Sequence, residues 1–495
     1  MAAVAMIVAG MLVARNNAPN ELPVPSVPVF FDPDFGAVDQ LSSGSRPNIV
    51  FVMVDDLDSE LIGHMPNLQS LVQAQGASFS NYFVTSALCC PSRSSFMRGQ
   101  YPHNTTILTN EDGFVKFHKT GLESSTVATW LQAGGYRTAL MGKYLNGYLE
   151  APGAGLFEFV PPGWSEWDVA GDGFREYDYT LNHNGTLERY GHRPQDFLTD
   201  VLTRRATDFI ERSVLASVPF FLELSTFAPH SPYTPPARFS NLFSGAKAPR
   251  PLSFNATGSG EPKWLAALPA LSTGQIESMD TIYRQRLQAV QGIDAAIATL
   301  VDTLRREKVL DNTYIIFTSD NGYHLGQHRL PAGKQTAFDS DIRVPLVIRG
   351  PGIHPRQVDA MAMNIDLAPT IAAWAGVSPP GFVDGRALQP VLWNRAPNDW
   401  RTTVLIEHTG PPTLPGDPDY QARDNPTSYS ALRTSSHLYV SSANGEEELY
   451  DRRVDPDELH NVVAQANAAM LRQLRDTLVA MRECKAQTCR RADAS

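Results

Sequence analysis

The chain has 495 residues, 42% apolar and 19% charged, an ordinary composition for a globular protein with room for a large core and a second domain. Its formal net charge of -11 and its lack of any basic block exclude the usual profile of a nucleic-acid-binding protein. We therefore expect small or glycan-like partners and no nucleic acid.

The first 45 residues are expected to be an export-type segment followed by a disordered lead-in. Residues 2–14 are apolar, but a membrane-spanning helix needs roughly 20 such residues. They suit the apolar core of a secretory signal, although no Lys or Arg precedes them and Arg15 follows. The Pro- and Ser-rich residues 17–45 are typical of disorder. We expect an exported protein, whether secreted, periplasmic or lysosomal, with no stable membrane span.

Apolar strands alternate with helical patterns between residues 46 and 386. Residues 49–54 lack polar alternation, which is typical of a strand covered on both faces. Residues 220–224, 314–317 and 345–348 repeat this pattern. One helix is predicted from a stripe formed by Ile293, Ile297, Leu300, Val301 and Leu304. The alternation predicts an α/β sandwich, with a large mixed, mostly parallel sheet flanked by helices.

The pattern changes after the turn-rich residues 378–381, and residues 387–495 are predicted to form a small α+β domain. Its expected antiparallel strands lie at residues 428–434, 437–441 and 448–451, with Asn444-Gly445 as a turn. Its final helix is marked by Leu471, Leu474, Leu478 and Met481. Near the C-terminus, Cys484 and Cys489 are close enough in sequence to close a loop, and in an exported protein we favour a disulfide between them.

Residues 89–93, Cys-Cys-Pro-Ser-Arg, are the most informative stretch of the chain. Pro91 suits the first turn of a helix, which would place Cys89 just before a helix N-terminus, where an anion is favoured. Arg93 would then lie one helical turn away, in reach of a carboxylate. Taken alone, the Cys pair is better explained by core thiols or a strained vicinal disulfide.

Oxygen-bearing side chains follow two of the predicted strands. Asp55 and Asp56 come directly after residues 49–54, and Asp320 and Asn321 follow residues 314–317. Ligand sites of open α/β sheets gather at the carboxyl ends of strands, and such hard ligands suit Ca²⁺ or Mg²⁺. Each motif alone is better explained as a turn or a helix cap. Together, with Cys89 between them in sequence, they predict a metal site.

These motifs resemble those of the sulfatases. In that family a formylglycine-generating enzyme converts the first Cys of Cys-Xaa-Pro-Ser-Arg, here Cys89, into Cα-formylglycine (3-oxoalanine). One hydroxyl of the hydrated aldehyde attacks sulfur, and deprotonation of the other expels sulfate. The resemblance spans residue 46 to about residue 463 and implies an alkaline-phosphatase-like fold. It also implies one divalent ion, usually Ca²⁺ with Mg²⁺ as the alternative, held by Asp55, Asp56, Cys89, Asp320 and Asn321.

The resemblance also assigns groups that bind sulfate. Lys143, His230 and Lys334 match sulfate-binding positions of the family, with His230 a candidate acid for the leaving oxygen. A lone lysine is more often solvated, and a His between prolines is more often structural. Many sulfatases carry a His two residues after the first of these lysines, where this chain has Leu145. We expect Asn146 to take that polar role, while His324 either lines the substrate cleft or caps a loop.

Residues 88–90, 143–146 and 160–164 resemble, more narrowly, the N-acetylglucosamine-6-sulfatase branch and its extracellular endosulfatase relatives. This implies a sulfuric ester hydrolase acting on a sulfated sugar, such as 6-O-sulfated glucosamine, or on an aryl sulfate. One alternative is a phosphomonoester or phosphonate ester hydrolase of the same superfamily, because the same cations and metal fit phosphate. Another is an inactive glycan-binding relative, which would have no need to keep every motif residue.

Overall fold

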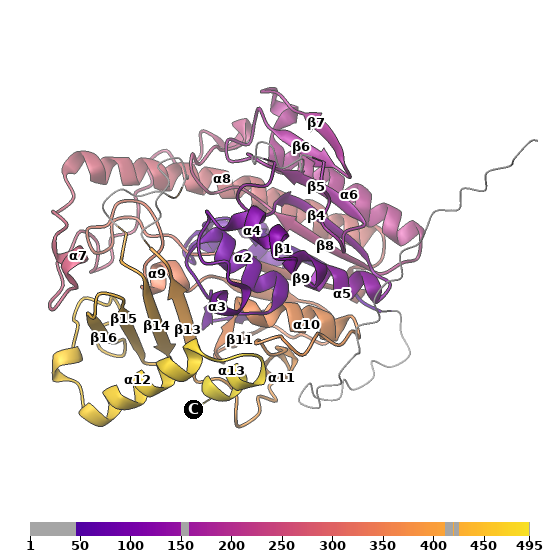
Figure 1. Cartoon of the computed structure of the whole chain (residues 1–495). Helices are drawn as coiled ribbons and strands as arrows, with labels where there is room; N and C mark the ends of the chain where they lie inside the picture. The colour runs from indigo at the N-terminus through magenta and orange to yellow at the C-terminus, as the bar shows by residue number, and fades with distance from the viewer. Residues whose placement is uncertain (1–45, 150–157, 411–418, 420–424, 495) are drawn as a thin grey trace, which may run out of the picture.

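The computed structural model describes residues 46–149, 158–410, 419 and 425–494. The signal-like segment and the lead-in expected in residues 1–45 lie outside the described residues. Within the described part, a ten-stranded sheet has the order β11-β2-β10-β9-β1-β8-β4-β5-β6-β7, and a separate sheet has the order β13-β14-β15-β16. Figure 1 shows the large sheet at the centre and the small sheet in yellow-orange beside it.

The strands are β1 (Asn48–Val54), β2 (Ala77–Phe79), β3 (Tyr82–Phe83), β4 (Arg137–Lys143), β5 (Glu166–Ala170), β6 (Thr180–His183), β7 (Thr186–Arg189), β8 (Phe220–Ser225), β9 (Thr313–Ser319), β10 (Leu346–Arg349), β11 (Arg356–Val358), β12 (Ala362–Met363), β13 (Thr403–His408), β14 (Tyr429–Thr434), β15 (His437–Ser442) and β16 (Glu447–Asp451). The α-helices are α1 (Pro66–Leu71), α2 (Cys89–Arg98), α3 (Pro102–Thr105), α4 (Gly113–Lys119), α5 (Val127–Ala133), α6 (Leu198–Leu215), α7 (Lys263–Ala266), α8 (Thr273–Arg306), α9 (Asp339–Ile342), α10 (Leu367–Trp374), α11 (Gln389–Leu392), α12 (Ala468–Arg482) and α13 (Gln487–Ala492).

The central strands β9, β1, β8, β4 and β5 run parallel to one another, as predicted for a mixed, mostly parallel sheet. β10 pairs antiparallel with β9. The apolar run at residues 345–348 therefore reflects burial of β10 rather than parallel pairing.

The unbroken apolar run of β1 follows from helices on both faces of the sheet. Ile49, Phe51 and Met53 belong to one core, which includes side chains of α2, α5 and α10. The alternate residues Val50 and Val52 belong to a second core, which includes side chains of α6 and α8. Because successive side chains of a strand point to opposite faces, both sets must be apolar.

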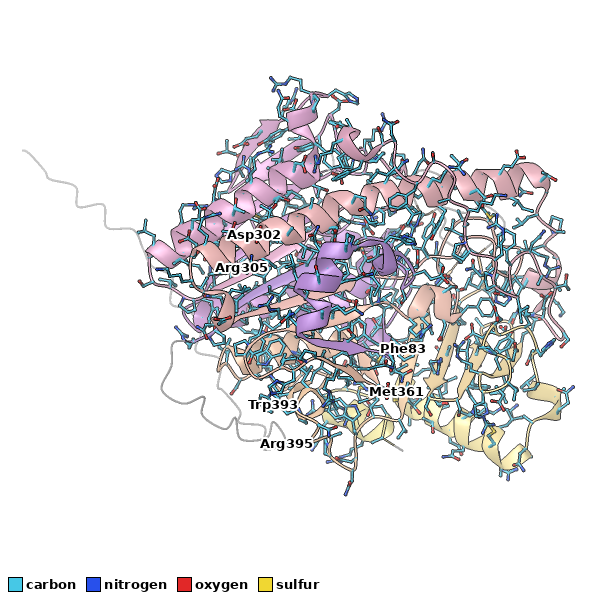
Figure 2. The ribbon with its side chains drawn as sticks, turned by 180° about the vertical axis from the view of Figure 1, so that it is seen from behind. Phe83, Asp302, Arg305, Met361, Trp393 and Arg395 are labelled. Atoms are coloured by element: carbon cyan, nitrogen blue, oxygen red, sulfur yellow. A yellow bond between two sulfur atoms is a disulfide. The ribbon has the colours of Figure 1, made fainter. Side chains whose placement is uncertain are left out.

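The small sheet is an antiparallel meander, as predicted for its last three strands. β13 adds a fourth strand that sequence analysis did not anticipate. The predicted final helix is α12, and Cys484 and Cys489 form the favoured disulfide. The small sheet shares a buried cluster with β3 and the segment before β12, where Figure 2 labels Phe83 and Met361. Among the described residues, we find no helix with the length and apolar character that crossing a membrane requires.

Candidate active site

Cys89 is the first residue of α2 and is completely buried. The helix begins one residue earlier than sequence analysis expects, so Cys89 lies inside its first turn. Its Sγ lies 3.0 Å from Lys334 Nζ and 3.4 Å from Asp55 Oδ1, and Asp419 Oδ2 is 3.7 Å from the same sulfur. Burial and then the Asp55 charge raise the pKa of Cys89 well above its ordinary value. The unmodified thiol is therefore neutral and a weak nucleophile.

Arg93 lies one helical turn after Cys89 and joins α2 to the ends of the neighbouring strands. Its Nε donates to Asp320 Oδ2 at 2.7 Å, and its Nη1 donates to Ser225 Oγ at 2.6 Å and to the Lys143 carbonyl at 3.2 Å. Its buried Nη2 has no hydrogen-bond partner among the residues that the structure describes. Burial lowers the pKa of Arg93, but the carboxylates, led by Asp320, raise it above its ordinary value. A charged donor therefore remains available beside residue 89.

β4 and β8 approach each other closely at Gly142. A Cβ atom at this position would lie 1.8 Å from the Ser225 carbonyl oxygen, and the φ angle of Gly142 is +117°. Glycine alone fits this conformation and this spacing without strain. The contact brings Lys143 and Ser225 together, so that Arg93 can bond both.

Parallel pairing of β1 with β9 brings the two acidic motifs together. Val54 stands opposite Ser319, so the residues that follow each strand emerge side by side at the carboxyl edge of the sheet. Asp320 Oδ1 accepts a hydrogen bond from the Asp56 N–H at 3.2 Å. Asp56 has a φ angle of +61°, a left-handed conformation that costs free energy and is held by its surroundings.

The side chains at this edge fit a hard divalent cation. Asp55 and Asp56 are buried, and their ligand atoms lie within 4.8 Å of those of Cys89 and His230. Asn321 Nδ2 donates to Asp56 Oδ1 at 2.7 Å. Its Oδ1 is buried and, in the part of the chain that the structure describes, accepts no hydrogen bond. Such an oxygen is costly unless a cation or a water satisfies it, and carboxylate and amide oxygens are the ligands that Ca²⁺ and Mg²⁺ prefer.

Asp320 stays ionised in these surroundings. Burial raises its pKa, but Arg93, Lys143 and Lys334 outweigh burial and hold the pKa of Asp320 below its ordinary value. An ionised carboxylate suits a metal ligand, whereas its low pKa makes it a weak base.

Three cationic side chains lie around Cys89. Lys143 Nζ bonds Asp55 Oδ2 at 2.6 Å, and Lys334 Nζ bonds Asp56 Oδ1 at 2.6 Å. His230 Nε2 lies 3.6 Å from Asp56 Oδ2. Burial lowers the pKa of His230, but the surrounding carboxylates, led by Asp56, raise it to about 9. The imidazole therefore carries a proton at neutral pH.

Asn110 and Asp419 join this group, although no sequence motif marks either residue. Asp419 Oδ1 accepts from Lys334 Nζ at 3.0 Å and from His230 Nε2 at 3.1 Å. Asn110 Nδ2 donates to Asp419 Oδ2 at 2.8 Å, while Asn110 Oδ1 accepts from the Cys90 N–H at 3.0 Å. Burial raises the pKa of Asp419, but Lys334 and His230 hold it well below its ordinary value. The chain thus presents a carboxylate to three donors beside Cys89.

Asn146 and His324 belong to the segments that surround these charged residues. The Asn146 N–H donates to Cys90 Sγ at 3.1 Å, and Asn146 lines a cavity of about 450 Å³ next to Lys143, while Leu145 is buried in the core. His324 Nδ1 bonds Asp341 Oδ1 at 2.9 Å, and its backbone pairs with Gly333, directly before Lys334. The buried Nε2 of His324 has no hydrogen-bond partner among the described residues.

Comparison with known sequences gives long matches. The profile of the Sulfatase family matches residues 47–377, and that of "N-sulphoglucosamine sulphohydrolase, C-terminal" matches residues 326–484. The N-acetylglucosamine-6-sulfatase of Homo sapiens is 36% identical over 478 residues, covering 90% of this chain and 86% of that protein. A putative extracellular sulfatase Sulf-1 homolog of Caenorhabditis elegans is 37% identical over 388 residues, covering 75% of this chain and 54% of that protein.

Comparison with solved structures gives the same fold. One match is a protein in complex with its substrate D-glucosamine-2-N,6-O-disulfate, with a TM-score of 0.74 and 24% identity over 88% of this chain and 97% of that one. The phosphonate monoester hydrolase of Agrobacterium radiobacter has a TM-score of 0.69 and 23% identity over 90% of this chain and 96% of that one. Identities at this level show the common fold alone.

Proposed function

Because this chain belongs to the sulfatase family, we propose that it hydrolyses sulfate monoesters of a sulfated sugar through a formylglycine hydrate at residue 89 and a bound divalent cation. One observation carries the proposal. Cys89 lies at a helix N-terminus, buried among Lys143, His230 and Lys334 and beside Asp55. Neither a structural thiol nor a glycan-binding surface requires this convergence of buried charges.

The nucleophile is the hydrate of an aldehyde derived from Cys89, since the thiol itself is held neutral. The Cys89 Sγ atom marks the place where a hydrate oxygen would stand. The Nη2 of Arg93, which has no hydrogen-bond partner among the described residues, is a charged donor for that hydrate. Attack by one hydroxyl on sulfur transfers the sulfuryl group and releases the sugar alcohol. Loss of the proton from the other hydroxyl then breaks the bond to the sulfate and restores the aldehyde.

The cation is assigned as Ca²⁺, with Mg²⁺ as the alternative. Asp55, Asp56, Asp320 and Asn321 would hold it, together with residue 89, and their oxygens are the hard ligands that both ions prefer. When bound, such an ion polarises a sulfate oxygen and lowers the pKa of the hydrate. The buried Oδ1 of Asn321 supports this assignment, because it is without a hydrogen-bond donor within the described residues.

The remaining cations bind the sulfate and assist the leaving group. Lys143 and Lys334 offset the negative charge of the sulfuryl oxygens. His230, whose pKa is raised to about 9, holds a proton that it can give to the departing sugar oxygen. Asn110 Nδ2, which bonds Asp419 in this structure, supplies a neutral donor at the same place.

The substrate is assigned as a sugar sulfate of the N-acetylglucosamine-6-sulfate type, with aryl sulfates as simpler substrates. The named activities of the relatives support this class. The cavity of about 450 Å³ beside Lys143 has a volume typical of small-ligand pockets. Asn146 and the half-buried ring of Phe174 line it, and both are assigned to the sugar. We assign His324 to the edge of the substrate site, because its buried Nε2 has no hydrogen-bond partner among the described residues.

Maturation and location follow from the same assignment. A formylglycine-generating enzyme is the partner that would convert Cys89. We assign the chain to an exported location, which the extracellular sulfatase relatives and the Cys484–Cys489 disulfide support.

The experiment that tests this function combines mass spectrometry with kinetics. Peptide mass spectra across residue 89 should show loss of the thiol and gain of an aldehyde. The purified protein should release sulfate from N-acetylglucosamine-6-sulfate and hydrolyse an aryl sulfate faster than the matching aryl phosphate. Cys89→Ala should abolish turnover, while the matched Cys90→Ala should be far milder. Substantial activity of Cys89→Ala would contradict the mechanism, and a preference for the phosphate would favour a phosphoester hydrolase.

A further inference from the structure

The carboxylate of Asp419 stands where the proposed function places sulfate. Its Oδ1 lies 3.0 Å from Lys334 Nζ and 3.1 Å from His230 Nε2, and its Oδ2 lies 2.8 Å from Asn110 Nδ2. Oδ2 is also 3.7 Å from Cys89 Sγ, the atom that marks the nucleophile. A carboxylate has two of the oxygen positions that a tetrahedral sulfate would present, so it can satisfy the same donors.

The placement of Asp419 is fixed through its backbone as well as its side chain. The Asp419 carbonyl accepts a hydrogen bond from Gln335 Nε2 at 3.0 Å. Gln335 directly follows Lys334 and is itself buried, with a φ angle of +83°. The side chain of Asp419 is only 7% exposed. The contact is therefore a buried, multiply bonded one, unlike a surface ion pair that solvent would weaken.

We propose that Asp419 competes with inorganic sulfate for the sulfate-binding donors and so weakens binding of the product of the reaction. This inference rests on the proposed function, because it takes Lys334, His230 and Asn110 as those donors. A free sulfate ion must displace the carboxylate, and it makes no contact beyond those with the three donors. A sulfate ester gains further contacts for its sugar in the neighbouring cavity, which offset the displacement. The internal carboxylate thus weakens binding of the product, inorganic sulfate, while the sugar contacts keep the ester bound.

The test measures binding of inorganic sulfate, so it needs no turnover. Isothermal titration calorimetry of the mature, metal-loaded protein with sodium sulfate should give a dissociation constant about tenfold lower in Asp419→Asn, since the amide keeps the shape but loses the charge. The matched control is Asp302→Asn, which removes the same charge from an exposed position on α8, labelled in Figure 2. Its affinity for sulfate should equal that of the unaltered chain.

Asp419→Glu serves as a second variant, because it keeps the charge and should leave sulfate binding weak. Unchanged or weaker sulfate binding in Asp419→Asn would overturn the proposal, as would an equal gain in Asp302→Asn. Failure of the proposed function gives a different result: the esters are not hydrolysed, whereas sulfate binding still reports on Asp419. Binding of sulfate in neither the unaltered chain nor Asp419→Asn would overturn the assignment of these donors to an anion.

Discussion

The ring of Phe174 lies 4.6 Å from the imidazole ring of His230, and its centre is also 5.0 Å from Lys143 Nζ. Phe174 therefore forms part of the wall of the cavity that we assign to the sugar, next to two of the cations that we assign to sulfate. An aromatic face so placed can pack against a sugar ring.

Phe174→Ala should lower kcat/KM on a sulfated sugar about tenfold, because it removes apolar contact area from the sugar site. Binding of inorganic sulfate, which does not reach this wall, should change less than twofold. Steady-state kinetics and sulfate titration measure the two effects. Phe382→Ala, which alters another half-buried ring that packs on Arg98, is the matched control. Equal losses in sugar turnover and in sulfate binding would contradict the assignment of this wall.

Calcium should stabilise the fold after chelation has removed bound metal. At a free concentration of one hundred times its dissociation constant, a bound ion contributes about 2.7 kcal/mol. Asn321→Ala removes the unbonded Oδ1 and should largely abolish the gain in melting temperature on adding Ca²⁺. Asn398→Ala, at an exposed position, should keep the full gain. The same thermal scans with Mg²⁺ identify the preferred ion, and a full calcium response in Asn321→Ala would remove Asn321 from the ligand set.

Gly142→Ala should destabilise the protein by roughly 3 kcal/mol or more, because its Cβ would meet the Ser225 carbonyl and its backbone is left-handed. Urea unfolding followed by circular dichroism measures the loss. Gly63→Ala is the control, since a Cβ there has nothing within 4 Å. A Gly142→Ala variant as stable as Gly63→Ala would mean that β4 and β8 can separate without cost.

Glu223 should make the fold less stable as the pH rises. This β8 side chain is buried, its Oε2 has no partner among the described residues, and burial, opposed by Arg93, raises its pKa to about 8. The folded state therefore binds a proton that the unfolded state has lost between pH 4.5 and pH 8. Its stabilising effect is fully present below pH 4.5 and is lost as the pH rises through about 8, a change of about 5 kcal/mol.

Glu223→Gln removes this titration. Relative to the unaltered chain, its free energy of unfolding should rise between pH 5 and about pH 8.5. Urea unfolding at several pH values measures this difference. The free energy of unfolding of the exposed variant Glu277→Gln should follow that of the unaltered chain at every pH. If the free energy of unfolding of Glu223→Gln also follows that of the unaltered chain at every pH, the carboxyl of Glu223 is bonded to a partner that keeps it ionised.

The central strands could be predicted from the sequence because burial on both faces leaves a continuous apolar run. β1 and β9 are such strands, and their parallel pairing explains why Asp56 and Asn321 meet although 265 positions separate them. β13 escaped prediction because its consecutive apolar residues, 404–406, are too few to distinguish a strand from other buried segments.

Asn110 and Asp419 could not be found from the sequence for a different reason. Neither follows a strand-like run or belongs to a short motif, and each is an ordinary polar residue of its neighbourhood. Their place at the site depends on tertiary contacts with Cys90, Lys334 and His230. Local sequence patterns predict the site residues that directly follow strands. They do not predict residues that only long-range tertiary packing brings to the site.

The complete burial of Cys89 sets an order of events in the life of the protein. An oxidising enzyme must bring its own reactive groups against the thiol, and once α2 has docked on the sheet the surrounding side chains leave no room for it. The conversion that we propose for this residue would therefore have to come during or soon after synthesis, while the chain is still open. A molecule that folds before this conversion would keep its thiol. Expression hosts in which the chain folds faster than it is modified would therefore yield folded but inactive protein.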